Sequence, residues 1–100
     1  MKGGSGMFSV WKFDLKVTDF VVLQMPEGAK VLSVAERGEF GNRLDVWALV
    51  DPDAPMRERR FRVVGTGHPF PDAEECRFVG TVQTRVGLVW HLFESVGEAA

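Results

Sequence analysis

The sequence contains a single cysteine, Cys76, and no apolar stretch of the roughly 18 residues that a membrane-spanning helix needs. A lone cysteine cannot form a disulfide within the chain, which fits a reducing cytosol. The N-terminus lacks the charged-then-apolar order of a signal peptide. Because no nucleophile motif surrounds Cys76, we interpret it as a small, partly buried apolar residue. We therefore predict neither a membrane protein nor a cysteine enzyme.

The chain also lacks a basic excess and a helical period. Its 12 lysines and arginines face 14 aspartates and glutamates, which leaves a formal net charge of −2. Proteins that bind nucleic acid generically carry a clear basic excess, so the composition argues against that class. No long stretch places apolar side chains at helical spacing. The composition otherwise suits a soluble globular protein.

Alternation of apolar and polar residues is the strongest positive signal. Residues 10–17 alternate strictly, with tryptophan, phenylalanine, leucine and valine on one face, as in a half-buried strand. Turns rich in glycine, proline or asparagine separate the remaining apolar segments. We predict an all-β fold, a small and mostly antiparallel β-sandwich or barrel of about seven strands. The further strands are expected at 20–25, 31–35, 44–50, 60–64, 77–84 and 88–93. In the strand at 77–84 we expect Phe78, Gly80 and Val82 on one face, and Gly80 indicates a bulge or a close backbone approach.

The length allows one domain. We place a single β-domain at residues 10–95. Residues 1–9 are expected to be a flexible tail or the remnant of an expression tag, because they begin with a glycine- and serine-rich linker composition. Residues 96–100 are expected to fray.

The segment 44–50 is apolar on both faces. Trp47 and Leu49 fall on the face opposite to the alternating leucine, valine and alanine residues. This pattern is typical of a central strand, or of a strand whose second face meets a partner. An outward tryptophan is often an interface anchor. We therefore predict a homo-oligomer with Trp47 and Leu49 at the interface.

A glycine-rich corner follows the strand predicted at 60–64, on which two arginines point outward. Backbone donors of such a corner, together with an arginine pair, could hold the phosphate or carboxylate of a nucleotide-like anion. The alternative is a strand-ending turn beside a solvated charged face, and the corner alone favours the turn. The candidate ligand-binding residues are Arg60, Arg62, Gly65, Thr66, Gly67 and His68.

Residues for metal or acid–base chemistry are few. His68, Asp72 and His91 could be imagined as ligands, but the chain lacks the spacing of known metal motifs. His91 lies in an apolar strand and is interpreted as a hydrogen-bonded strand histidine. Acid–base catalysis by His68 with Asp72 stays open, because spacing says little about distance in a β-fold. We predict no metal, no cofactor and no catalytic residue.

Several short motifs follow one another in a distinctive order: Val10–Phe13, Met25–Lys30, Trp47–Pro55, Arg60–Phe61, Gly65–Pro69, Gly80–Gln83 and Leu88–Glu94. In this order they resemble a family of small uncharacterised proteins from tailed bacteriophages and prophages. The resemblance implies a viral origin and a location in the cytoplasm of the bacterial host. It brings no activity, cofactor or catalytic residue to this chain.

Three functions remain as expectations. The first is a phage-encoded, non-enzymatic binding protein that counters host defence by sequestering a nucleotide immune signal or a host defence protein. The second is a virion structural or assembly component, such as a decoration or adaptor domain. The third is a small hydrolase that uses His68, Asp72 and an arginine.

Overall fold

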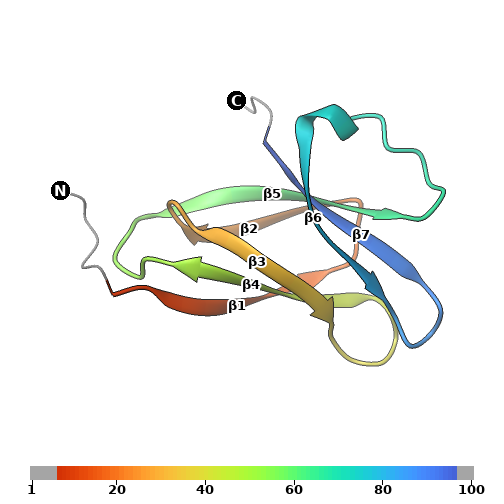
Figure 1. The fold of residues 1–100 in the computed structure, drawn as a ribbon, viewed down its shortest axis with the longest axis horizontal. Helices are drawn as coiled ribbons and strands as arrows, with labels where there is room; N and C mark the ends of the chain where they lie inside the picture. The colour runs from red at the N-terminus through yellow and green to blue at the C-terminus, as the bar shows by residue number, and fades with distance from the viewer. Residues whose placement is uncertain (1–6, 97–100) are drawn as a thin grey trace.

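A computed structural model describes residues 7–96 and confirms the all-β sandwich. Most of the two predicted tails, at 1–6 and 97–100, lies outside the described residues. Two antiparallel sheets face each other across the core (Figure 1). No helix in the described part of the chain is long and apolar enough to cross a membrane. The strands are β1 (Ser9–Lys16), β2 (Phe20–Pro26), β3 (Lys30–Glu36), β4 (Arg43–Val50), β5 (Met56–Gly65), β6 (Cys76–Gln83) and β7 (Val89–Ser95).

The two sheets divide the strands three to four. One sheet has the order β1-β4-β3, and the other has the order β2-β5-β7-β6. The two-faced strand predicted at 44–50 is β4, and it lies in the centre of its sheet as expected. A short 3₁₀ helix, η1 (Ala73–Glu75), is the only helical element among the described residues. The connection from β5 to β6 passes β7, which lies between them.

The core fills the space between the sheets, and in β4 its residues alternate strictly with less buried ones. In β4, Leu44, Val46 and Ala48 are fully buried, while the intervening residues are only half-buried. The opposing sheet contributes Phe61 of β5 and Leu92 of β7, which are also inaccessible. Burying one such side chain stabilises the fold by about 1.5–3 kcal/mol. The period of two seen in the sequence therefore corresponds to the inner and outer faces of each sheet.

Strand β5 begins earlier than the sequence suggested. The expected start was Arg60, but the strand begins at Met56, directly after Pro55. Its charged first half pairs with β2, where Arg57 lies opposite Met25 and Glu58 opposite Gln24. A strand with charged side chains lacks the alternating apolar residues by which a strand is predicted, although its backbone can still pair.

Strand β6 contains the irregularity that its glycine indicated. The pairing with β7 shifts between Phe78 and Gly80, so one extra residue interrupts the ladder. A Cβ atom on Gly80 would lie 2.8 Å from Cγ1 of Val34, because the edge strands β3 and β6 meet there. The bulge corrects one expectation. Phe78 does not share a face with Val82; it lies on the outer face opposite Phe93 and is 57% exposed.

Candidate functional site

Arg62, one of the predicted ligand-binding residues, is engaged by other residues of the protein. Its side chain is only 8% exposed. The guanidinium donates to the Asp72 carboxylate and to the carbonyl oxygen of Asp19, the latter at 3.1 Å from Nε. It also lies over the rings of Phe20 and Phe70, 4.3 and 5.0 Å from their centroids. Arg62 therefore fastens the loop between β5 and η1 to the sheet, whereas the Arg60 guanidinium lies 3.7 Å from the Glu58 carboxylate.

The glycine corner forms the turn that the sequence left as an alternative. The His68 backbone N–H donates to the Gly65 carbonyl at 3.0 Å, and Gly67 has a φ of 85°. The His68 ring lies against Gly65, where an added Cβ would be 2.8 Å from it. A cavity of about 240 Å³ adjoins the corner, lined by Gly65, Thr66, His68 and residues 87–90. Ligand binding at this corner stays a prediction.

The two histidines have separate structural surroundings. His91 Nε2 lies 2.8 Å from the Thr66 hydroxyl, and Nδ1 lies 2.9 Å from the Thr81 hydroxyl. These contacts confirm a hydrogen-bonded strand histidine. Asp72 is engaged by Arg62, and no hydrogen bond joins it to His68 within residues 7–96. Acid–base catalysis by His68 with Asp72 stays a prediction, and the contact that the structure shows for Asp72 is the one with Arg62.

A different cluster of charges lies inside the sandwich at one end. Glu94 of β7 is on the inner face, opposite Phe61 of β5, and its side chain is 5% exposed. Arg59 donates hydrogen bonds to both carboxylate oxygens of Glu94, from Nε to Oε2 and from Nη2 to Oε1, the latter at 3.1 Å. Arg59 Nη1 also donates to the Ala29 carbonyl at 2.8 Å. Such a two-pronged contact fixes the guanidinium more firmly than a single hydrogen bond does.

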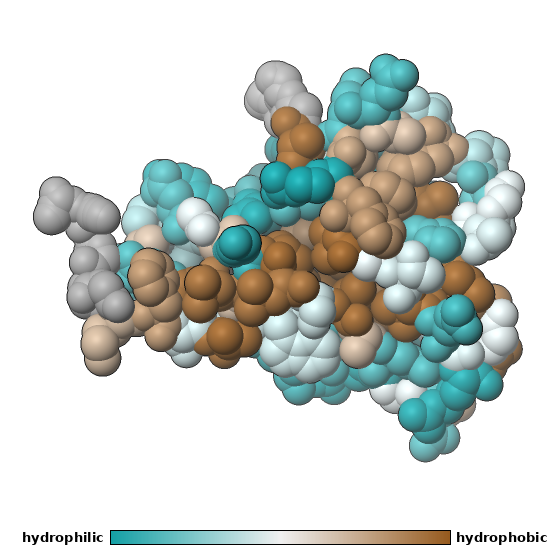
Figure 2. Space-filling view, viewed as in Figure 1, coloured by the Kyte–Doolittle hydropathy of each residue, from teal (hydrophilic) through white to brown (hydrophobic). Residues whose placement is uncertain are grey.

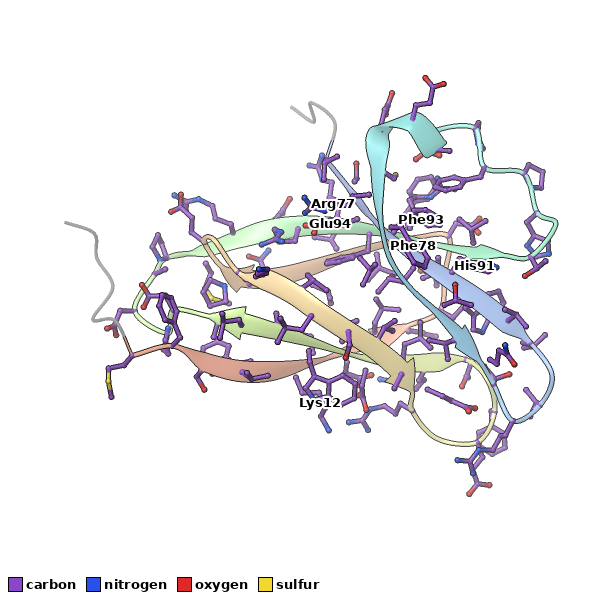
Figure 3. The ribbon with its side chains drawn as sticks, in the orientation of Figure 1. Lys12, Arg77, Phe78, His91, Phe93 and Glu94 are labelled. Atoms are coloured by element: carbon purple, nitrogen blue, oxygen red, sulfur yellow. The ribbon has the colours of Figure 1, made fainter. Side chains whose placement is uncertain are left out.

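A second arginine approaches the same carboxylate from β6. Arg77 Nη2 lies 3.3 Å from Glu94 Oε1, but the Arg77 side chain is 64% exposed. Figure 3 shows Arg77 and Glu94 close together, with Phe78 and Phe93 next to them along β6 and β7. Arg59 is thus fixed, whereas most of the Arg77 guanidinium remains accessible to solvent.

The cluster is exposed to a cleft because two paired strands separate. The pairing of β5 with β7 stops at Phe61 and Glu94. Beyond that point the β7 end turns toward η1, where the Val96 N–H donates to the Glu75 carbonyl at 2.8 Å. A cavity of about 460 Å³ opens between the diverging ends. Its lining consists of Glu58, Arg59, Arg60, Arg77, Glu94, Ser95 and Val96.

A second cavity of about 540 Å³ lies on the other side of the cluster. The turn between β2 and β3 and the first residues of β6 form its walls. Both cavities share Arg59, Arg77 and Glu94, so we refer to them together as the Arg59 cleft. Its cations are Lys30, Arg59, Arg60 and Arg77, and its carboxylates are Glu58 and Glu94.

The charge balance of the Arg59 cleft favours an anion. Four cations face two carboxylates, and the exposed guanidiniums of Arg60 and Arg77 can donate further hydrogen bonds. Among residues 7–96, no group of three or more histidine, cysteine, aspartate or glutamate side chains could hold a metal ion. The cleft therefore offers positive charge and donors.

Arg60 and Arg62 were singled out from the sequence, whereas the cluster of Arg59, Arg77 and Glu94 was missed. A signal was nevertheless present. In β5, Arg59 lies two residues before the inward Phe61, and in β7, Glu94 lies two residues after the inward Leu92, so both charged residues occupy core-facing positions. Opposite charges at core-facing positions of two strands indicate a buried ion pair, because unpaired buried charges are costly.

The sequence comparisons assign a family. A model of a domain of unknown function, DUF7352, matches residues 7–100. The chain belongs to the DUF7352 family. This agrees with the predicted membership of an uncharacterised family. No curated protein and no solved structure matches the DUF7352 chain.

Proposed function

We propose that this DUF7352 protein is a non-enzymatic binding protein that receives an anionic ligand in the Arg59 cleft. The observation that supports this is the unequal freedom of the cleft arginines. Arg59 is fixed by Glu94, whereas Arg77 is mostly exposed above the same carboxylate. A fixed cation reduces the entropy lost on binding, and an exposed one supplies new donors.

A panel of anionic ligands tests this proposal. Isothermal titration calorimetry would measure binding of inorganic phosphate, cyclic dinucleotides and ADP-ribose derivatives. Arg77→Gln is expected to weaken binding at least about tenfold, because a charge-assisted hydrogen bond is worth about 1.5–3 kcal/mol. Arg57→Gln is the matched control, since Arg57 is 57% exposed, pairs with Glu27 at 3.4 Å and lines neither cavity. Failure of every anion to bind would overturn the proposal.

We also propose a biological setting for this protein. In it, the protein is encoded by a tailed phage, acts in the host cytoplasm and sequesters a nucleotide immune signal or a host defence protein. Its support is the motif order from Val10 to Glu94 and the positive charge of the Arg59 cleft. Phage plaque counts on defended hosts, with wild type and Arg77→Gln supplied in trans, test it. Equal protection by both proteins contradicts a role for the cleft.

A virion or assembly component is the second candidate. The outer face of the three-stranded sheet carries Val10, which is 54% exposed and lies opposite Leu49. Trp47 follows on the same face, half-buried between Lys12 and Ser33. This face also supports the proposed homo-oligomer. Mass spectrometry of purified virions distinguishes the candidates, because a binding protein of the host cytoplasm is not retained in particles.

A further inference from the structure

Phe78 is an exposed aromatic ring that is already held in position. Its centroid lies 5.5 Å from that of Phe93 in an edge-to-face arrangement, with an angle of 66° between the planes. Phe93 is in turn fixed by Phe70, 4.7 Å away. Despite these contacts Phe78 is 57% exposed. A ring that is held by a neighbouring ring and is still largely exposed can stack with a planar group at little further entropic cost.

Phe78 lines the same cavity as the cations. The wall of the 540 Å³ cavity includes Phe78 together with Lys30, Arg59 and Arg77. Neighbouring residues on a strand point to opposite faces, so Arg77 reaches inward to Glu94 while Phe78 points outward to Phe93. Arg77 and Phe78 both line this cavity beside β6, so a ligand in the cavity can touch both side chains.

The surface around this site has the same mixed character. Figure 2 shows hydrophobic residues gathered over β3 and the neighbouring β6, with hydrophilic residues along the border. The cavity volume falls within the roughly 300–1,000 Å³ that is usual for small-molecule sites. The site therefore pairs positive charge with an open aromatic ring at the size of one small ligand.

We propose that the anion bound by the Arg59 cleft is the phosphate of a nucleotide, and that Phe78 stacks on its base. This rests on the function proposed above. Arg59, Arg77 and Lys30 receive the phosphate, and the planar base lies against the exposed side of the Phe78 ring. A simple carboxylate or an inorganic phosphate would use the cations alone.

Three probes separate the parts of the proposal. Calorimetric titration of the full chain with adenosine 5′-monophosphate, ribose 5-phosphate and inorganic phosphate measures the contribution of the base. The nucleotide is expected to bind about tenfold more tightly than ribose 5-phosphate, which is the usual effect of one base–aromatic stack. Phe78→Leu is expected to remove that difference and to leave ribose 5-phosphate binding unchanged. Arg77→Gln is expected to weaken both.

The control is Phe40→Leu, because Phe40 is 79% exposed and lies outside both cavities of the Arg59 cleft. Thermal unfolding of each variant shows that it is folded. Equal affinity for the nucleotide and ribose 5-phosphate, or an unchanged difference in Phe78→Leu, overturns the stacking inference. If Arg77→Gln still weakens phosphate binding in that case, the anion-binding function stands. If neither these probes nor the cyclic dinucleotides and ADP-ribose derivatives bind, both proposals fall.

Discussion

Single charged residues explain much of what distinguishes this β-sandwich. Arg59 and Glu94 occupy positions that alternation assigns to the core, and they satisfy each other there. Burying one charge without the other is costly, so the two residues depend on each other. Arg62 is covered by its own loop and by two aromatic rings, although its outward phase suggested a solvated or ligand-binding arginine.

Replacing Glu94 tests this dependence. Glu94→Gln leaves the Arg59 guanidinium, which is 19% exposed, without its counter-charge. We expect the free energy of unfolding to fall by about 3 kcal/mol, the lower end of the cost of breaking a buried pair. Urea denaturation at neutral pH measures it. Glu58→Gln is the control, because Glu58 is 57% exposed and 3.7 Å from Arg60. Equal stability of the two variants contradicts a buried pair.

The contact between Asp72 and Arg62 predicts how the stability of the fold changes at acidic pH. The Arg62 guanidinium lowers the pKa of Asp72 below its ordinary value of 3.8. A carboxyl group whose folded pKa is depressed stabilises the fold above its unfolded pKa, and that contribution disappears as the pH falls through the folded pKa. We therefore expect wild type to lose stability below about pH 4 more steeply than Asp72→Asn. Chemical denaturation from pH 7 to pH 2 measures it.

Asp14, whose pKa is also lowered by its hydrogen bond with Arg43, is present in both proteins and its effect cancels in the comparison. Parallel stability profiles of wild type and Asp72→Asn would show that the Arg62 contact does not stabilise the fold.

At the level of elements, the edge strands β3 and β6 meet where β6 carries its bulge. Gly80 leaves room for a methyl group of Val34, as the 2.8 Å approach of a hypothetical Cβ shows. The bulge also turns Phe78 to the outer face. One extra residue in β6 thus sets both the contact between the sheets and the direction of the aromatic ring beside the Arg59 cleft.

Gly80→Ala is expected to force β3 and β6 apart and to lower stability by about 1–3 kcal/mol, as overpacking of a core does. Val34→Ala alone is expected to lower stability through lost packing. In the double variant the two losses should not add, because the smaller side chain makes room for the new methyl group. Thermal or urea unfolding of all four proteins completes the cycle. Strict additivity contradicts the close contact.

At the level of the whole molecule, the two outer faces differ. The four-stranded sheet is partly covered by the loop that carries Phe70 and Asp72. The three-stranded sheet presents Trp47 and Leu49 beside the exposed Val10. An apolar strip next to charged neighbours suits contact with a second copy better than a face already covered by its own chain.

Analytical ultracentrifugation tests the homo-oligomer. Wild type is expected to sediment as an oligomer at high micromolar concentration, and Trp47→Lys as a monomer, because a desolvated lysine without a partner opposes association. Val22→Lys is the control, since Val22 is 53% exposed on the other sheet. A monomeric wild type, or an oligomer that survives Trp47→Lys while the fold is intact, contradicts this interface.

The order of residues alone determined where the seven strands and their turns lie, and the two faces of strands such as β1 and β4. The alternation in residues 10–17 and the glycines at the turns are local signals, because backbone geometry and side-chain period act over a few residues. They were enough to predict seven strands, the central position of β4 and the irregularity at Gly80.

Only the tertiary structure decided which charges meet. Arg59 and Glu94 are 35 residues apart, and Arg77 reaches the same carboxylate from another strand. Their convergence depends on the strand order β5-β7-β6 and on the point where β5 and β7 diverge. In the same way, only the tertiary structure shows that Arg62 contacts Asp72 of the loop that follows its own strand. Long-range pairing carries no local signal, and so the cleft could not be located from the sequence.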